Sequence, residues 1–199
     1  MTSKSASPPG LVLASTSPFR RELLGRLGLP FETAAPEVDE TRRGGESPQQ
    51  LVVRLAEAKA RAASDRFPGS VIIGSDQVAC IDDRILGKPG NREQAIEQLR
   101  QASGRSVDFF TGLCVLEASG TANVVCEPFR VHFRTLSDTR IAHYVDREKP
   151  FNCAGSFKSE GLGIALFERL EGDDPNSLIG LPLIRLVEML EAAGIQVLG

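Results

Sequence analysis

The feature that most constrains the fold is the order in which helix and strand patterns follow each other along the chain. In the first half, short apolar strands alternate with amphipathic helices. In the second half, two long runs of alternating apolar residues, 106–117 and 123–136, predict an antiparallel ribbon. Helices that alternate with strands early, and hairpins that come later, favour an α/β (mixed α+β) fold with a mixed, partly antiparallel sheet flanked by helices.

Helix and strand ends are indicated by capping residues, prolines and glycines. Ser17 with Pro18 predicts a helix that ends near Leu27, and Ser47 with Pro48 predicts a long one that ends near Arg66. Further helices are expected after Asn91, from Ser137 to about Glu148, and over 182–193. Strands are expected at 11–15, 31–35, 70–81 (interrupted at 74–76), 84–89 after a turn at 82–83, and 164–170.

Composition excludes several classes of protein. No apolar run approaches the roughly 20 residues that a membrane helix needs, and a net charge of -3 gives no sign of a nucleic-acid surface. The two histidines make a histidine-built metal site or a Ser-His-Asp triad improbable, and the four cysteines are far apart, without C-x-x-C spacing. Residues 1–10 have no hydrophobic signal core and are expected to be a disordered tail before a single domain at 11–199, in a cytoplasmic protein.

The stretch "LVLASTSPFRR" at 11–21 changes abruptly from an apolar strand to hydroxyl residues and two arginines. A helix N-terminus presents free backbone N–H groups, to which Ser15 adds a hydroxyl and Arg20 a guanidinium. Together these groups suit a phosphate. A capped surface helix with solvated arginines explains the same residues equally well, because the stretch contains neither a Walker A motif nor a Gly-rich dinucleotide fingerprint.

A carboxylate also appears within a strongly apolar strand, in "GSDQ" at 74–77. Groups at the carboxyl ends of strands line the ligand crevice of open α/β sheets, and the sequence places Asp76 at such an end. A carboxylate there must be paired, bind a metal or act as a base. The alternative is that Asp76 only caps a turn.

Other charged groups fit a site for a polyanion. Lys59 lies on the alanine-rich face of a helix, Lys88 ends a strand in "GKP", and Lys158 lies among glycines. Asp39 and Glu40 on a polar loop can hold a divalent cation, since hard cations prefer oxygen ligands. Each of these residues alone is more often a solvated surface group.

In this order, the motifs resemble the Maf family of nucleotide pyrophosphatases, over residues 11 to about 193. The matching segments are "LASTSPFRRELL", "EVDE", "RLAEAKA", "IIGSDQV", "GKP", "TGL", "YV…KP…CAGSFKSEG" and "GLPL". The resemblance implies a Maf/ITPase-like fold with two lobes around a central cleft. It also implies cleavage of a nucleoside triphosphate to the monophosphate and pyrophosphate, with a divalent metal, Mg²⁺ or Mn²⁺.

The resemblance assigns roles to individual residues. Asp76 matches the catalytic carboxylate and a metal ligand, Arg20 and Lys59 match phosphate binders, and Lys88 matches another cation of the site. Ser15 matches a substrate-binding position. Asp39 and Glu40 match further positions of the cleft, where they are expected to bind the metal.

Three residues are similar to those of the YceF-like subgroup, which hydrolyses 7-methyl-GTP. Phe19 and Glu160 stand where the branch that cleaves dTTP and UTP has arginine and glutamine, and Gln77 stands where it has threonine. The usual aromatic residue at position 19 of the subgroup is tryptophan, from which this chain departs. N7-methylated guanine is positively charged and is attracted by an aromatic face, and Glu160 can accept hydrogen bonds from its N1–H and N2–H groups. Without the resemblance, Phe19 is a hydrophobic helix residue and Glu160 a solvated acid.

Two other functions stay open. One is a pyrophosphatase for other canonical or modified nucleotides, such as dTTP or UTP, and the other is a nucleotide-sensing regulator of cell division that binds without turnover. The expected partner is a small nucleotide substrate, with no nucleic acid and no membrane. The long antiparallel ribbon can present an edge to a second copy, so that a homodimer is possible.

Overall fold

A computed structural model describes residues 10–82 and 84–199 of the chain, and in these residues the sheet has seven strands. The strand order is β2-β1-β3-β5-β6-β7, and the short β4 pairs with the end of β3. β1 is parallel to β2 and β3, and all other pairs are antiparallel. The strands are β1 Leu11–Ala14, β2 Glu32–Ala34, β3 Val71–Ile81, β4 Arg84–Leu86, β5 Ser106–Leu116, β6 Ala122–Phe133 and β7 Phe167–Glu171. The expected mixed, partly antiparallel sheet is confirmed. Of the tail expected at 1–10, residues 1–9 lie outside the described part.

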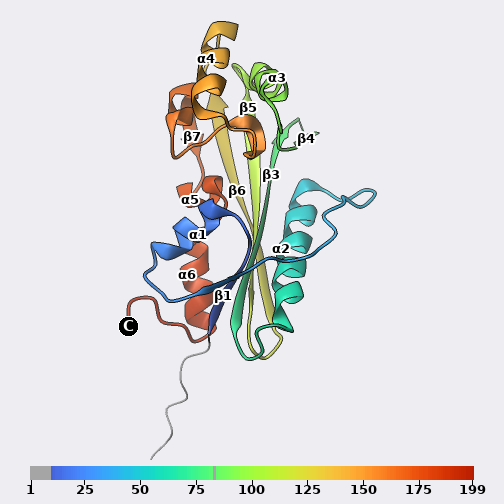
Figure 1. The fold of residues 1–199 in the computed structure, drawn as a ribbon, viewed down its shortest axis with the longest axis vertical. Helices are drawn as coiled ribbons and strands as arrows, with labels where there is room; N and C mark the ends of the chain where they lie inside the picture. The colour runs from blue at the N-terminus through green and yellow to red at the C-terminus, as the bar shows by residue number, and fades with distance from the viewer. Residues whose placement is uncertain (1–9, 83) are drawn as a thin grey trace, which may run out of the picture.

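Helices lie on both faces and at one end of the sheet (Figure 1). α2 covers one face, and α1 and α6 cover the other. α3 and α4 lie at the upper end, beside β4 and β7. The α-helices are α1 Pro18–Gly25, α2 Pro48–Ser64, α3 Arg92–Ala102, α4 Asp138–Glu148, α5 Pro175–Ile179 and α6 Leu183–Ala192, and the 3₁₀ helices are η1 Ala154–Ser156 and η2 Leu162–Leu166.

Four of the predicted helix starts are confirmed by the capping geometry. The hydroxyl groups of Ser17, Ser47 and Ser137 and the side-chain oxygen of Asn91 each accept a hydrogen bond from a backbone N–H in the first turn. Ser47 also forms a reciprocal capping box with Gln50. The ends differ by up to two residues from the sequence expectation, as helix ends fray.

The predicted interruption of the strand at 74–76 is wrong. β3 is continuous from Val71 to Ile81, because β5 pairs with it through the whole segment, with Asp76 opposite Gly112. On the other side, β1 ends at Ala14, which pairs with Gly74. Asp76 therefore lies in mid-strand rather than at a strand end, two residues beyond the point where the neighbouring strand stops.

Two glycines bring α2 unusually close to the sheet. A Cβ atom added to Gly74 would lie 2.0 Å from the carbonyl oxygen of Ala56, and one added to Gly112 would lie 2.1 Å from that of Val52. Neither residue has a positive φ, so the requirement is for space and not for backbone conformation. The close approach fixes the position of α2 relative to β3.

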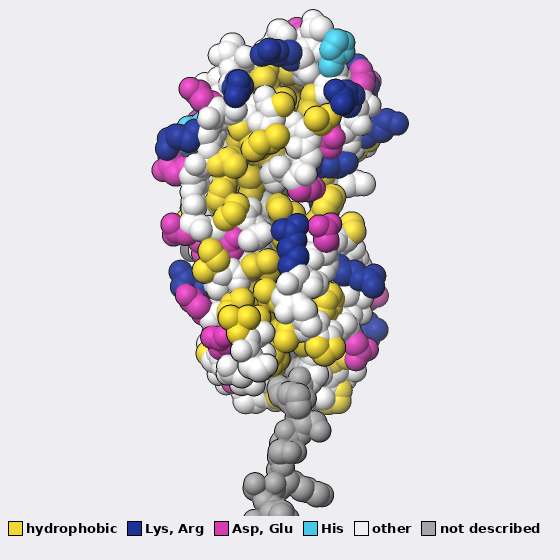
Figure 2. Space-filling view, turned by 90° about the vertical axis from the view of Figure 1, so that its left-hand side faces the viewer, with side chains coloured by type: hydrophobic (Ala, Val, Ile, Leu, Met, Phe, Trp, Pro, Cys, Tyr) yellow, Lys and Arg dark blue, Asp and Glu magenta, His cyan; other side chains and the backbone are white. Residues whose placement is uncertain are grey.

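The long strands β3, β5 and β6 pass through two lobes (Figure 1). The lower lobe contains β1, α1, α2 and α6, and the upper lobe contains β4, β7, α3 and α4. β2 belongs to the lower lobe because it pairs with β1. The face drawn in Figure 2 shows apolar side chains in the hollows between charged ones along both lobes. The two lobes expected from the resemblance are thus present.

Two further differences concern the C-terminal third of the chain. The strand expected at 164–170 begins only at Phe167, since 162–166 form η2. The short helix α5 has no counterpart among the predicted elements. β7 pairs with Arg130–Phe133 of β6, so that part of the ribbon edge is covered, and the homodimer stays a prediction.

Candidate active site

A cavity of about 790 Å³ lies between the two lobes. Its lining comes from segments far apart in the sequence: the β1–α1 junction, α2, the middle of β3, the 85–88 segment, the 149–160 loop and the end of α5. The predicted residues that line it are Ser15, Phe19, Arg20, Glu40, Lys59, Asp76, Gln77, Lys88, Lys158 and Glu160. The volume lies within the range of roughly 300–1,000 Å³ that is usual for small-molecule sites.

The β1–α1 junction is held by its own hydroxyl groups. The backbone N–H of Ser17 donates to Oγ of Ser15 at 3.1 Å, and the N–H of Arg20 donates to Oγ of Ser17 at 3.4 Å. Pro18 occupies the first turn, where it sacrifices no helical hydrogen bond. The junction therefore places Ser15, Phe19 and Arg20 on the wall of the cavity.

The Arg20 guanidinium is oriented by one backbone carbonyl. Its Nε donates to the carbonyl oxygen of Gly180 at 2.8 Å, and Oγ of Ser75 donates to the same oxygen at 3.0 Å. Desolvation by the surrounding protein lowers the pKa of Arg20, whereas the charges of Asp76 and Glu40 act in the opposite direction. Since guanidinium stays protonated in proteins, the group presents a fixed positive charge to the cavity.

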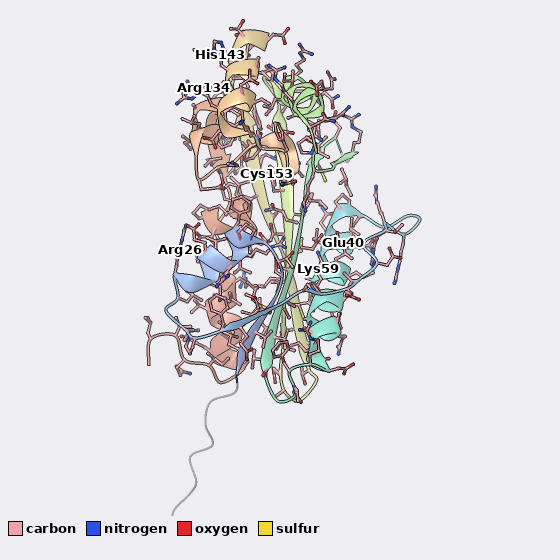
Figure 3. All side chains as sticks on the ribbon, in the orientation of Figure 1. Arg26, Glu40, Lys59, Arg134, His143 and Cys153 are labelled. Atoms are coloured by element: carbon pink, nitrogen blue, oxygen red, sulfur yellow. The ribbon has the colours of Figure 1, made fainter. Side chains whose placement is uncertain are left out.

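Two carboxylates converge on one buried ammonium group. Nζ of Lys59 lies 2.6 Å from Oδ1 of Asp76 and 2.6 Å from Oε1 of Glu40. Figure 3 shows Lys59 and Glu40 side by side at α2. The Asp76 and Lys59 side chains are buried, whereas that of Glu40 is 61% exposed. The hydrogen bond from Lys59 lowers the pKa of Glu40, so that the carboxylate is ionised at neutral pH.

Gln77 has a fixed orientation on β3. Its Nε2 donates to the carbonyl oxygens of Ser177 at 2.7 Å and Leu178 at 3.2 Å, and to Oγ1 of Thr111 at 3.0 Å. Because two of these partners are carbonyls, which only accept, the amide nitrogen must face them. In the part of the chain that the structure describes, no donor is hydrogen-bonded to Oε1 of Gln77, so this atom can accept a hydrogen bond.

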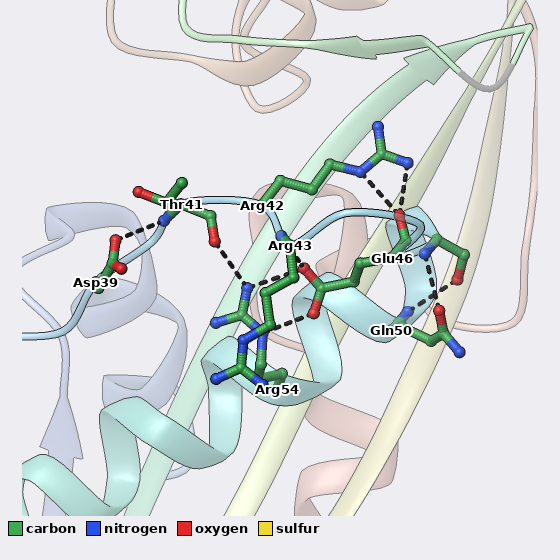
Figure 4. A network of polar contacts seen from close by, with 8 residues as sticks. Asp39, Thr41, Arg42, Arg43, Glu46, Gln50 and Arg54 are labelled. Carbon is green, nitrogen blue, oxygen red and sulfur yellow. Dashed lines mark hydrogen bonds and ion pairs between the residues drawn. The ribbon is translucent and has the colours of Figure 1, made fainter.

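The structure separates the predicted pair of loop carboxylates. Glu40 lines the cavity, whereas the exposed Asp39 does not and accepts a hydrogen bond from the N–H of Thr41 at 2.9 Å. Hydrogen bonds from Thr41 lower the pKa of Asp39. The same loop is held by Arg54, which bonds Glu46 at 2.6 Å and the carbonyl oxygen of Thr41 at 3.1 Å (Figure 4). Asp39 thus belongs to the polar network of the loop.

Comparison with known proteins identifies the family. The sequence profile of the Maf-like protein family matches residues 10–193. The chain belongs to the Maf family. A protein of Nitrosococcus oceani named 7-methyl-GTP pyrophosphatase is 57% identical to this Maf chain over 199 residues, which is all of both chains. One of Pseudomonas aeruginosa with the same name is 57% identical over 190 residues, covering 95% of this chain and 99% of the relative.

The fold of this Maf protein is similar to that of solved structures. A HAM1 protein from Coxiella burnetii has a TM-score of 0.50 and 15% sequence identity, and the match covers 92% of this chain and 99% of that one. At this level of identity the similarity concerns the fold alone. In the described residues, none of the helices of the Maf chain has the length and apolar character needed to cross a membrane.

Sequence reasoning missed two basic or polar groups of the cavity wall. Lys149 and Asn152 line the cavity beside Cys153. Lys149 ends α4 in the left-handed region at φ 47°, which is uncommon for a residue other than glycine. The dipeptide Lys149–Pro150 indicated that the helix ends here, since the right-handed helical region is disfavoured for a residue before proline.

The carboxylates of the cavity fit a divalent cation that is shared with a phosphate. No group of three or more His, Cys, Asp or Glu side chains suited to a metal ion is found among residues 10–82 and 84–199. Mg²⁺ usually keeps several waters and binds one or two carboxylates together with substrate phosphates. Glu40 and Asp76, which meet at Lys59, are the pair available for this.

Proposed function

We propose that this Maf protein hydrolyses 7-methyl-GTP to 7-methyl-GMP and pyrophosphate. The observation that carries the proposal is the convergence of Asp76, Lys59, Arg20 and Lys88 on one cavity between the lobes. The names of relatives that are 57% identical over nearly the whole chain support the same activity. An acid beside several cations is what the cleavage of a triphosphate requires, since charge builds up on oxygens in its transition state.

The proposed reaction is in-line attack of water on the α-phosphorus, with pyrophosphate as the leaving group. Asp76 orients the water and accepts its proton through the carboxylate oxygen that is not bonded to Lys59. Lys59 holds the carboxylate in place and contributes positive charge beside it. Arg20 and Lys88 bind the phosphates that leave and stabilise the charge they acquire.

A divalent cation belongs to the same proposal. Bound Mg²⁺ or Mn²⁺ would neutralise charge on the phosphate oxygens during the displacement. Glu40 and Asp76 are the residues proposed to hold it. A role for Asp39 as a further metal ligand stays a prediction from the sequence, because Asp39 belongs to the polar network of the loop and does not line the cavity.

Base selection is assigned to three side chains of the wall. Phe19 offers an aromatic face to the cationic ring of N7-methylguanine. The exposed Glu160 accepts from the N1–H and N2–H groups of the base, which uracil and thymine lack. Gln77 contributes its Oε1 acceptor, since its nitrogen is bonded to α5 and Thr111. The substrate pool of such an enzyme fits a cytoplasmic protein.

Steady-state hydrolysis of 7-methyl-GTP, GTP, dTTP and UTP, with and without a chelator, tests the proposal. We expect pyrophosphate as the product, the highest kcat/KM for 7-methyl-GTP, and loss of turnover with the chelator. Orthophosphate release would identify a phosphatase instead. Saturable binding of 7-methyl-GTP without any turnover in added metal would favour a nucleotide sensor.

A further inference from the structure

A second cavity, of about 260 Å³, lies in the upper lobe between α4 and η2. Its rim contains Arg134, Arg140, His143 and Arg147, and none of the described residues that line it is acidic. Arg140, His143 and Arg147 follow each other at spacings of three and four on α4, which places them on one face of the helix. Figure 3 shows Arg134 and His143 together at the upper end of the molecule.

The three arginines of this rim form no ion pair within the described part of the chain. Among the described residues, no carboxylate lies within 4.0 Å of the guanidinium of Arg134, Arg140 or Arg147. Arg134 is oriented by a hydrogen bond from Nε to the carbonyl oxygen of Phe167 at 2.7 Å. Other arginines of the upper lobe, such as Arg92 and Arg100, are paired with Asp146 and Asp138. The rim is therefore an unneutralised positive patch around a cavity.

The other residues that line the cavity are mainly apolar. They are the buried Leu136, Leu166 and Tyr144, the half-buried Leu162 and the exposed Ala165. An apolar interior with a positive rim is complementary to a molecule that has an apolar body and an anionic end. We propose that this cavity binds a small organic phosphate, with the phosphate on the arginines of α4 and the apolar body against Leu162 and Tyr144.

Tyr144 connects this cavity with the loop of the candidate active site. Its ring lines the second cavity, and its hydroxyl oxygen accepts a hydrogen bond from the backbone N–H of Lys158 at 3.0 Å. Lys158 and Glu160 line the first cavity, and Leu162 of the second follows two residues later. A ligand that immobilises Tyr144 and Leu162 therefore stabilises the loop that carries Glu160 from both of its ends. By linkage, occupancy of one cavity then changes affinity at the other.

The composition of the chain provides a selective probe of the proposed site. Tyr144 is the single tyrosine and the sequence has no tryptophan, so all of the intrinsic fluorescence comes from a residue in the wall of this cavity. Hexyl phosphate has an apolar body and an anionic end, and it does not absorb light at the wavelengths that excite tyrosine. We expect it to change the fluorescence saturably, inorganic phosphate to bind at least about tenfold more weakly, and hexanol to give no saturable change.

Charge-removing variants locate the binding. We expect the double variant Arg140→Gln/Arg147→Gln to weaken hexyl phosphate at least about tenfold, because charge-assisted hydrogen bonds are lost. The matched control Arg169→Gln removes an arginine on β7 that does not line the cavity, and it should bind normally. If the double variant binds hexyl phosphate as tightly as the unaltered protein, the proposal is overturned. The same holds if binding is lost in Arg20→Gln/Lys88→Gln instead, since this result places the ligand in the first cavity.

The coupling has its own readout. Saturating hexyl phosphate should change KM for the nucleotide substrate by at least about fivefold in the unaltered protein and not in the Arg140→Gln/Arg147→Gln variant. Hexyl phosphate that binds at Tyr144 without any change in KM would overturn the link through Lys158. An equal change in both proteins would show direct competition in the first cavity, and this also contradicts the proposal.

Discussion

Substitution of Gly74 by alanine tests how the active site is held together. The added Cβ would lie 2.0 Å from the carbonyl oxygen of Ala56 and 2.8 Å from the amide nitrogen of Ala60. Contacts below 3.0 Å are essentially never seen for real Cβ atoms, so α2 must move away from β3 by at least about 1 Å. Because both partners are backbone atoms of one helix, no side-chain rotation can relieve the contact.

We expect Gly74→Ala to lower the free energy of unfolding by about 3 kcal/mol, which is the upper end of typical overpacking effects. For a domain of this size, this corresponds to a decrease in Tm of roughly 6–12 °C. The same displacement moves Lys59 relative to Asp76, which now lie 2.6 Å apart. A misplacement of about 1 Å in a catalytic group can cost on the order of 100-fold in rate. We therefore expect kcat to fall by that order even in protein that is fully folded.

The assay combines thermal unfolding with hydrolysis of 7-methyl-GTP at a temperature well below the lowered Tm. Gly25→Ala is the matched control, because a Cβ at Gly25 has no neighbour within 4 Å and its φ is negative. This control should retain both its Tm and its kcat. If Gly74→Ala unfolds within a degree of the unaltered protein and turns over normally, the close packing of α2 does not position Lys59, and the reasoning is refuted.

Three further predictions concern the chemistry. Asp76→Asn should retain nucleotide binding in an equilibrium titration but lose on the order of 100- to 10,000-fold in kcat, and near-normal turnover would remove Asp76 from its role. Lys59→Met should move the acidic limb of the pH–rate profile to higher pH, because Lys59 lowers the pKa of Glu40, and its loss makes the carboxylate protonate at a higher pH; an unchanged limb contradicts this. Phe19→Arg with Glu160→Gln should shift the kcat/KM ranking from 7-methyl-GTP toward UTP and dTTP, and an unchanged ranking argues against the proposed base pocket.

Local signals predicted the helix starts and the general form of the sheet. Caps such as Ser47 and Asn91 act within one turn of the chain, so that the sequence around them suffices. The continuity of β3 through Asp76 depends on pairing with β5, more than thirty residues away, and a single strand carries no mark of it. The glycine at 74 was interpreted as a break, whereas its role is to admit α2.

At the candidate site, too, the sequence did not predict features that depend on the three-dimensional arrangement. Asp39 and Glu40 are neighbours in sequence, yet only Glu40 reaches Lys59, because adjacent side chains in an extended loop point in different directions. Residue type indicated a pair of ligands but not which of the two faces the cavity. Helix α5 was missed because five residues are too few to show a helical period.

The stretch from Ser177 to Gly180 contributes no proposed catalytic group, yet its carbonyls bond both Arg20 and Gln77. Arg20, which is assigned to the phosphates, and Gln77, which is assigned to the base, are therefore oriented by hydrogen bonds to the same four-residue stretch of main chain. A substitution that shifts this stretch therefore alters both the selectivity for the base and the binding of the phosphates. Neither property can be changed alone by a substitution at these four residues. Every residue type has a backbone carbonyl, so the residue types at 177–180 do not indicate that Arg20 and Gln77 depend on this stretch.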